Sequence, residues 1–187
     1  MLIFETAITG VSAAVLQRFV RRAQKLARVA GEVDVLISSN QRLQALNRRF
    51  RRKNKPTDVL SFPRSTGGDI AISAQIARQN AARYGHGIAE ELKILVLHGM
   101  LHLAGYDHEA DDGEMARLES RLRAQLKLPA SLIDRTQSLP KAAQKKSTRP
   151  KTSRAANATI RIKSARAPRK AWSITTPRKT KSVRSTQ

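Results

Sequence analysis

Three of the four histidines in this 187-residue chain lie in one short stretch, His98-Gly99-Met100-Leu101-His102-Leu103-Ala104-Gly105-Tyr106-Asp107-His108. In a helix, His98 and His102 lie one turn apart on the same face. Gly105 can end that helix in the left-handed conformation, so that the chain turns back and brings His108 to the same point. Three neutral imidazoles with a fourth position left to water form the ligand set of a catalytic zinc site. The stretch therefore predicts one Zn²⁺ per chain, bound by His98, His102 and His108.

The first two histidines are predicted to lie on a helix at residues 88–104. Residues 94–97, at its centre, are apolar on every side, which is typical of a buried helix. Strands and helices do not alternate regularly, so we expect an α+β fold with a small mixed sheet packed by helices. The central apolar helix then carries two of the three zinc ligands. Hydrophobic periodicity predicts the other helices at 11–30, from 39 or 40 to about 50, at 74–84 and at 112–126, and strands at 2–8, 33–38, 57–62 and 68–73.

The charge of the chain is strongly positive and unevenly spread. The formal net charge is +22, from 36 Lys and Arg residues against 14 Asp and Glu residues. Residues 137–187 contain fifteen of the basic residues and none of the acidic ones. We predict a folded domain at 1–130 and a basic C-terminal extension at 137–187, which is disordered because it cannot bury enough apolar surface. A polyanion is the expected partner, nucleic acid before anionic membrane.

No targeting or membrane segment is recognisable in the sequence. The first ten residues lack the basic start of a signal peptide and contain Glu5. No apolar run approaches the roughly 20 residues that span a bilayer. We therefore expect a soluble, cytoplasmic protein with no membrane partner.

The remaining side chains near the histidines limit what the metal site can be. Cysteine is absent, which excludes thiolate ligands and leaves histidine and carboxylate. Asp107 and Glu109 flank His108 and are expected to orient an imidazole or to accept a proton. His86 lies in a Gly-rich connector and is expected at the surface rather than at the metal.

A basic cluster precedes Pro56. A helix end favours some positive charge, but six basic residues among eight exceed that need. Cations of this kind can stabilise the charge that develops on a phosphodiester during its hydrolysis. The cluster consists of Arg48, Arg49, Arg51, Arg52, Lys53 and Lys55.

The spacing of the histidines matches the metzincin protease signature H-E-x-x-H-x-x-G-x-x-H, with one difference. Gly99 stands where those enzymes carry the glutamate that serves as general base for peptide hydrolysis. Without this proton acceptor, a metalloprotease is the less favoured hypothesis.

Four segments together resemble the YbeY endoribonucleases, a family of rRNA maturation factors. The segments are Leu46–Arg51, Pro56–Pro63, Gly68–Ser73 and the histidine stretch through Glu109, and the resemblance covers roughly residues 1–128. It implies a compact α+β fold with zinc on the three histidines. It also implies a single-strand-specific endoribonuclease that acts in late 16S rRNA 3′-end maturation and ribosome quality control.

The resemblance also suggests roles for individual residues and partners. Arg51 corresponds to the proposed catalytic or RNA-positioning cation of the family, and Arg52, Lys53 and Lys55 would bind RNA beside it. The implied partners are rRNA in the small ribosomal subunit and a ribosomal protein or a ribosome-associated GTPase. Three histidines alone do not establish that water at the metal is used, so a non-catalytic ribosome assembly factor with structural zinc stays the alternative.

The sequence departs from the family pattern in four places. Phe50 replaces the usual tyrosine, and Asn54 replaces a usual aspartate. The connection from Phe62 to Gly68 and the segment after His108 are both shorter than is typical. None of these changes touches the metal ligands, so we expect their consequences in substrate preference.

Overall fold

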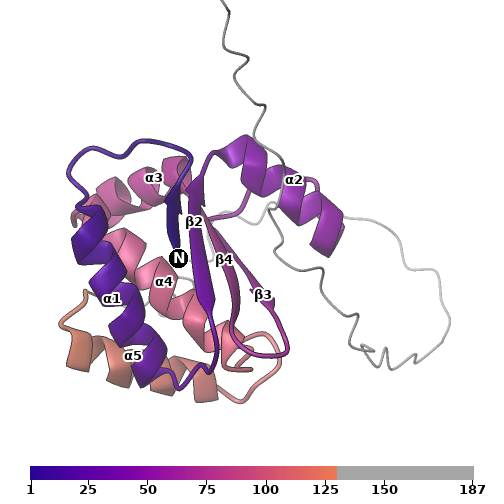
Figure 1. The fold of residues 1–187 in the computed structure, drawn as a ribbon, viewed down its shortest axis with the longest axis vertical. Coiled ribbons are helices and arrows are strands. Elements are labelled where there is room, and N and C mark those ends of the chain that lie inside the picture. The colour runs from indigo at the N-terminus through magenta and orange to yellow at the C-terminus, as the bar shows by residue number, and fades with distance from the viewer. Residues whose placement is uncertain (130–187) are drawn as a thin grey trace, which may run out of the picture.

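The computed structural model describes residues 1–129, and the predicted extension at 137–187 lies outside the described residues. Four strands and five helices form the described part and confirm the α+β class (Figure 1). In chain order they are β1 (Leu2–Phe4), α1 (Ala13–Leu26), β2 (Val33–Ser38), α2 (Asn40–Arg51), β3 (Val59–Pro63), β4 (Gly68–Ser73), α3 (Ala74–Tyr84), α4 (Ile88–Leu103) and α5 (Glu114–Leu126).

The strands form one mixed sheet in the order β1-β2-β4-β3. Strands β1, β2 and β4 are parallel, whereas β3, which a tight turn joins to β4, runs antiparallel to it and forms one edge of the sheet. All six residues of β2 and all six of β4 are buried. The sequence predicted one strongly apolar side for residues 33–38; both sides are buried because helices cover both faces of the sheet.

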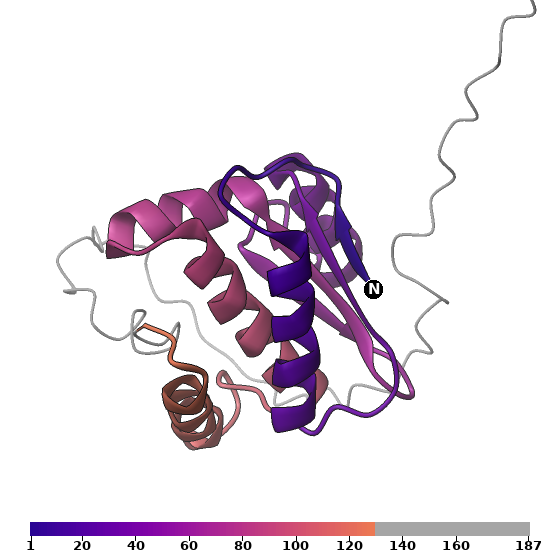
Figure 2. The same cartoon turned by 60° about the vertical axis from the view of Figure 1, so that its left-hand side comes forward.

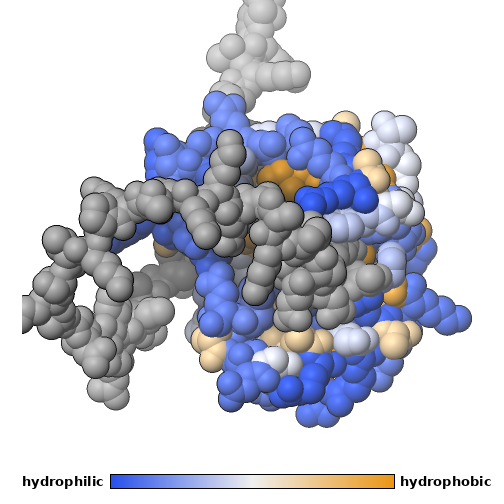
Figure 3. All heavy atoms as spheres, turned by 180° about the vertical axis from the view of Figure 1, so that it is seen from behind, coloured by the Kyte–Doolittle hydropathy of each residue, from blue (hydrophilic) through white to orange (hydrophobic). Residues whose placement is uncertain are grey.

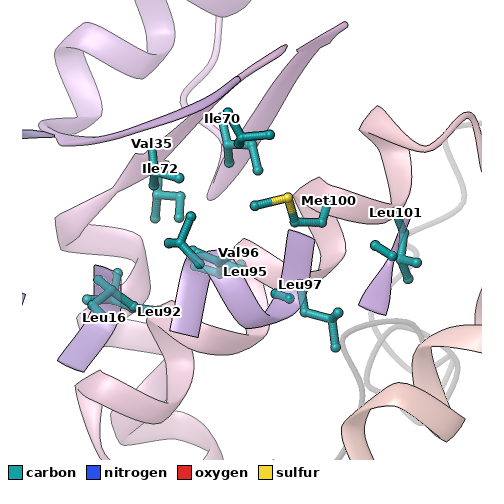
Figure 4. Close-up of a cluster of buried hydrophobic side chains, with 14 of the residues drawn as sticks. Leu16, Val35, Ile70, Ile72, Leu92, Leu95, Val96, Leu97, Met100 and Leu101 are labelled. Carbon is teal, nitrogen blue, oxygen red and sulfur yellow. The ribbon is translucent and has the colours of Figure 1, made fainter. Parts of the chain in front are cut away.

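Helices α1 and α4 lie side by side on one face of the sheet, as the turned view in Figure 2 shows. The central helix is confirmed, since residues 94–97 are fully buried. Figure 4 shows the core on this face, where Val35, Ile70 and Ile72 of the sheet meet Leu95 and Met100 of α4.

Helix α2 covers the opposite face of the sheet. Its Leu43 and Leu46 pack on Leu60 and Ala71, and Phe62 lies at the border of this second, smaller core. Because side chains alternate along a strand, Ala71 faces α2 while its neighbours Ile70 and Ile72 face α4. The fold therefore has one sheet between two helical layers.

Local hydrogen bonds account for where the helices begin and end. The side chains of Ser12, Ser39 and Ser73 accept hydrogen bonds from the first turns of α1, α2 and α3. Helix α1 is shorter than the predicted 11–30, because Ser12 caps its start and Arg28 is left-handed just beyond its end. Strand β1 is shorter than the predicted 2–8 and ends at Phe4. No helix of the described residues is both long and apolar enough to cross a membrane.

Candidate metal centre

The three histidines in the stretch from His98 to His108 converge in the structure. One ligand atom from each of His98, His102 and His108 lies within 4.8 Å of the others. The Nε2 atoms of His98 and His102, one turn apart on α4, are separated by 3.2 Å. Gly105 follows the helix with a φ of 94°, and the turn after it returns His108 to the pair. The predicted convergence through a left-handed glycine is confirmed.

The surroundings of His102 favour its neutral form. Its pKa is lowered from 6.5 to about 4, first by burial and then by the neighbouring His98 and His108. Asp107 and a hydrogen bond with the backbone of Tyr106 act in the opposite direction. A neutral imidazole with a free lone pair is the form that binds a metal, so the net lowering of the pKa suits a ligand at neutral pH.

A buried carboxylate contacts Nδ1 of His98, the ring nitrogen that does not face His102. Oε2 of Glu119 lies 3.4 Å from Nδ1 of His98, and Glu119 is fully buried on α5. A carboxylate oxygen accepts, so the contact places the imidazole proton on Nδ1 and leaves the lone pair on Nε2, which faces His102. This arrangement is the usual outer support of a metal-binding histidine.

Sequence reasoning missed Glu119, although a signal was present. It occupies the same face of α5 as the buried residues Met115, Leu122 and Leu126. A carboxylate in the middle of an apolar helical stripe needs a polar partner inside the protein. Which partner it meets depends on how α5 packs against α4, and this is not visible in the sequence.

Asp107 and Glu109 lie in the turn that follows α4 and are exposed. Oδ1 of Asp107 accepts a hydrogen bond from the backbone N–H of Glu109, and the carboxylate acts on His102 through its charge. Their predicted roles in orienting an imidazole or accepting a proton stay predictions.

His86 lies outside the group of three histidines, as expected, but it is less exposed than predicted. Its Nε2 lies 2.7 Å from Oε2 of Glu91, and its side chain is only 10% exposed. Glu91 is a fully buried carboxylate in the first turn of α4, so the histidine turns inward to meet it. His86 is nonetheless separate from the group of three histidines that can hold a metal.

Gly99 faces the sheet rather than the histidine centre. Its carbonyl accepts a hydrogen bond from Oγ of Ser61 at 3.2 Å. A Cβ at this position would lie 2.9 Å from Cγ2 of Ile70. The position that carries the general base in metzincins is therefore packed against β3 and β4, where a glutamate side chain has no room.

The predicted RNA-binding cations lie at the end of α2 and in the loop that follows it, and α2 packs on the face of the sheet opposite α4. Arg51 is the last residue of α2, and Arg52 caps the helix in the left-handed conformation. The side chain of Asn47 donates to the carbonyl of Lys55 at 2.7 Å and so fixes the loop that follows. Arg51, Arg52, Lys53 and Lys55 are all exposed. None of these four residues lies on α4, the helix that carries His98 and His102.

Where the described residues are visible in Figure 3, their surface is mostly hydrophilic, with a few small hydrophobic patches. Exposed large hydrophobic side chains among residues 1–129 are limited to Met1, Val15 and Phe50. Phe50 is the one that lies within the basic cluster.

Known proteins resemble this chain over most of its length. A family model described as Endoribonuclease YbeY matches residues 4–127. A protein of Koribacter versatilis named Endoribonuclease YbeY is 55% identical over 152 residues, which cover 80% of this chain and 100% of the relative. A protein of the same name from Solibacter usitatus is 52% identical over 126 residues, 66% of this chain and 85% of the relative. The solution structure of TM1509 from Thermotoga maritima, 26% identical, aligns with a TM-score of 0.47 over 78% of this chain and 100% of that one.

Proposed function

The chain belongs to the YbeY endoribonuclease family, and from this premise we propose that it is a zinc-dependent endoribonuclease that cleaves single-stranded RNA. Its proposed task is late 16S rRNA 3′-end maturation and ribosome quality control, in contact with the small ribosomal subunit in the cytoplasm. The observation that carries the proposal is the convergence of three imidazoles within 4.8 Å in a member of this family. A ribosomal protein or a ribosome-associated GTPase is the proposed recruiting partner.

The donor set of the centre fits zinc. Three neutral imidazoles, with no thiolate or carboxylate among the direct ligands, suit Zn²⁺ better than Mg²⁺ or Ca²⁺, which prefer oxygen ligands. His98, His102 and His108 would hold the ion. When bound, zinc supplies hydroxide at neutral pH by lowering the pKa of water to about 7.

The protein's own residues would orient a metal ligand and bind the RNA strand. Glu119 keeps Nδ1 of His98 protonated and so keeps the ring in one orientation. Arg51 is proposed to hold a phosphate through its planar guanidinium, which can donate two hydrogen bonds at once. Arg52, Lys53 and Lys55 would bind neighbouring phosphates along the same strand.

One experiment separates catalysis from assembly. Zinc-loaded wild-type protein and a His102→Ala variant, shown to be folded by circular dichroism, are incubated with a single-stranded 16S rRNA 3′ fragment and with a duplex of the same sequence. We expect the wild type to cleave the single strand and the variant to leave it intact. A His86→Gln variant, which changes the histidine outside the centre, is the matched control and should cleave like the wild type.

The other outcomes contradict the proposal in different ways. Equal cleavage by wild type and His102→Ala would mean that the histidine centre is not used and would point to a contaminating nuclease. Binding without cleavage by every protein would favour a ribosome assembly factor with structural zinc.

A further inference from the structure

Phe50 is an exposed aromatic ring in the middle of a basic surface. Its side chain is 36% exposed, although Leu43 and Leu46, which precede it at helical spacing, are buried. The ring centroids of Phe50 and Phe62 lie 5.0 Å apart at an interplanar angle of 63°, an edge-to-face contact. Phe62 thus supports the ring from the side of the sheet while part of Phe50 stays open to solvent.

One cation lies over this ring. The guanidinium carbon of Arg49 lies 5.2 Å from the centroid of Phe50. Arg48 and Arg51 flank the pair in the sequence and are exposed. Aromatic rings and guanidinium planes are the two kinds of group on which unpaired bases stack, and here they occur next to each other.

We propose that Phe50, supported by Phe62 and covered on one face by Arg49, is a stacking platform for an unpaired base of the RNA. This inference rests on the proposed function, because it assigns a contact to the strand that is cleaved. The base lies on the exposed part of the Phe50 ring, and the phosphates on either side meet the cations of the basic cluster. Every base has a π-face, so the contact favours single strands without reading a particular sequence.

The edge strand β3 lies between α2, which carries this platform, and α4, which carries two of the three histidines. The hydroxyl of Ser61 bonds to the carbonyl of Gly99, next to His98 on α4. The following residue, Phe62, points to the other face, where it meets Phe50. An RNA strand that crosses the free edge of β3 can therefore reach both faces, with a base on Phe50 and its backbone directed toward the histidines. In a duplex both faces of a base are already stacked, so a paired strand gains nothing from the platform.

Substitutions at Phe50 test the stacking in the full-length protein. Binding of a fluorescent single-stranded RNA is measured by anisotropy at fixed salt for wild type, Phe50→Ala, Phe50→Leu and Phe50→Tyr. Because Phe50→Ala removes the ring on which the base stacks, it should weaken binding about tenfold, which corresponds to about 1.4 kcal/mol. Phe50→Leu should weaken it nearly as much, because leucine is apolar without a π-face, and Phe50→Tyr should bind like the wild type. Val15→Ala, which removes an exposed apolar side chain on α1, is the control and should change nothing.

RNA that lacks one base identifies the contact directly. A series of oligonucleotides, each with a single abasic nucleotide, is measured with wild type and with Phe50→Ala. We expect one or two positions where removal of the base weakens wild-type binding and where the further effect of Phe50→Ala disappears. This coupling distinguishes stacking from a general loss of folding, which would weaken binding to every oligonucleotide alike.

Two results would overturn the stacking inference and leave the proposed function standing. Phe50→Leu binding as well as the wild type would reduce the platform to an ordinary apolar contact. Abasic RNAs that all respond equally to Phe50→Ala would show that no base sits there. If instead the wild type and Val15→Ala both failed to bind single-stranded RNA, the proposed function would fall, and this inference with it.

Discussion

At the residue scale, Glu119 decides which nitrogen of His98 is available at the centre. It lies 3.4 Å from Nδ1 of His98 and is fully buried. We expect Glu119→Gln to weaken zinc affinity by about 10–100-fold, as is usual when such an outer partner is removed. The affinity is measured by competition with a chromogenic chelator at pH 7.

A second glutamate on the same helix provides the control. Glu114 lies in the first turn of α5 and is exposed. Glu114→Gln removes the same charge at a distance from His98 and should leave zinc affinity unchanged. Equal decreases in both variants would mean that Glu119 acts only through the total charge of α5.

The lowered pKa of His102 predicts a dependence of stability on pH in the metal-free protein. The folded protein binds a proton at His102 only near pH 4, whereas the ordinary value is 6.5. Between these values the unfolded chain binds more protons, so the free energy of unfolding falls as the pH falls through this window. Urea unfolding in the presence of a chelator, at pH 7 and at pH 4.5, should therefore show a larger decrease for wild type than for His102→Asn. A decrease of the same size in both proteins would assign the acid sensitivity to other groups.

The residues of the site differ in how far the sequence reveals them. His98, His102 and His108 are close in sequence, and one helical turn and one left-handed glycine suffice to bring them together. Glu119 and the Phe50–Phe62 pair depend on packing between separate elements, α5 with α4 and α2 with β3. Local pattern predicts the first kind of geometry, and only tertiary packing produces the second.

At the element scale, the turn between β3 and β4 depends on Gly67. Its φ is 73°, and a Cβ there would lie 2.0 Å from the backbone oxygen of Glu32. We expect Gly67→Ala to lower the free energy of unfolding by more than the roughly 1–2 kcal/mol of left-handed backbone strain, because the backbone at Glu32 must also be pushed away. Urea denaturation followed by circular dichroism measures the change.

A substitution at Gly10 separates the backbone strain from the steric clash with the backbone of Glu32. Gly10 has a φ of 80°, but a Cβ there would meet nothing within 4 Å. Gly10→Ala should therefore show the backbone strain alone and a smaller destabilisation than Gly67→Ala. Identical destabilisation would mean that the turn at Gly67 moves away from Glu32 without resistance.

Helix positions were predictable to within a few residues, whereas the sheet was less so. Apolar periodicity and the capping residues Ser39 and Ser73 locate α2 and α3 closely. The pairing of β2 with β4 passes over α2 and β3 in the chain, and no local pattern specifies it. The burial of β2 on both faces also depends on which helices cover it.

At the scale of the whole molecule, the sheet separates two chemical surfaces. The metal centre belongs to α4 on one face, and the basic cluster with Phe50 belongs to α2 on the other. The edge strand β3 contacts both helices, through Ser61 toward α4 and Phe62 toward α2. A substrate that uses both surfaces must be flexible enough to pass around this edge, which suits a single RNA strand better than a stiff duplex.

The basic extension adds a charge that acts on the whole molecule. Residues 137–187 carry fifteen Lys and Arg residues and no acidic residue. Each phosphate that a protein neutralises on a single strand adds about 0.7 to the slope of log affinity against log salt. Truncation after residue 136 should therefore weaken RNA binding at low salt and flatten this slope by that amount for every phosphate the extension neutralises, while zinc content stays the same. Anisotropy titrations from 50 to 200 mM salt, roughly the range over which electrostatic binding weakens, measure the slope in both proteins. An unchanged slope would mean that the extension does not touch the RNA and that the cations of residues 1–136 supply the whole electrostatic attraction.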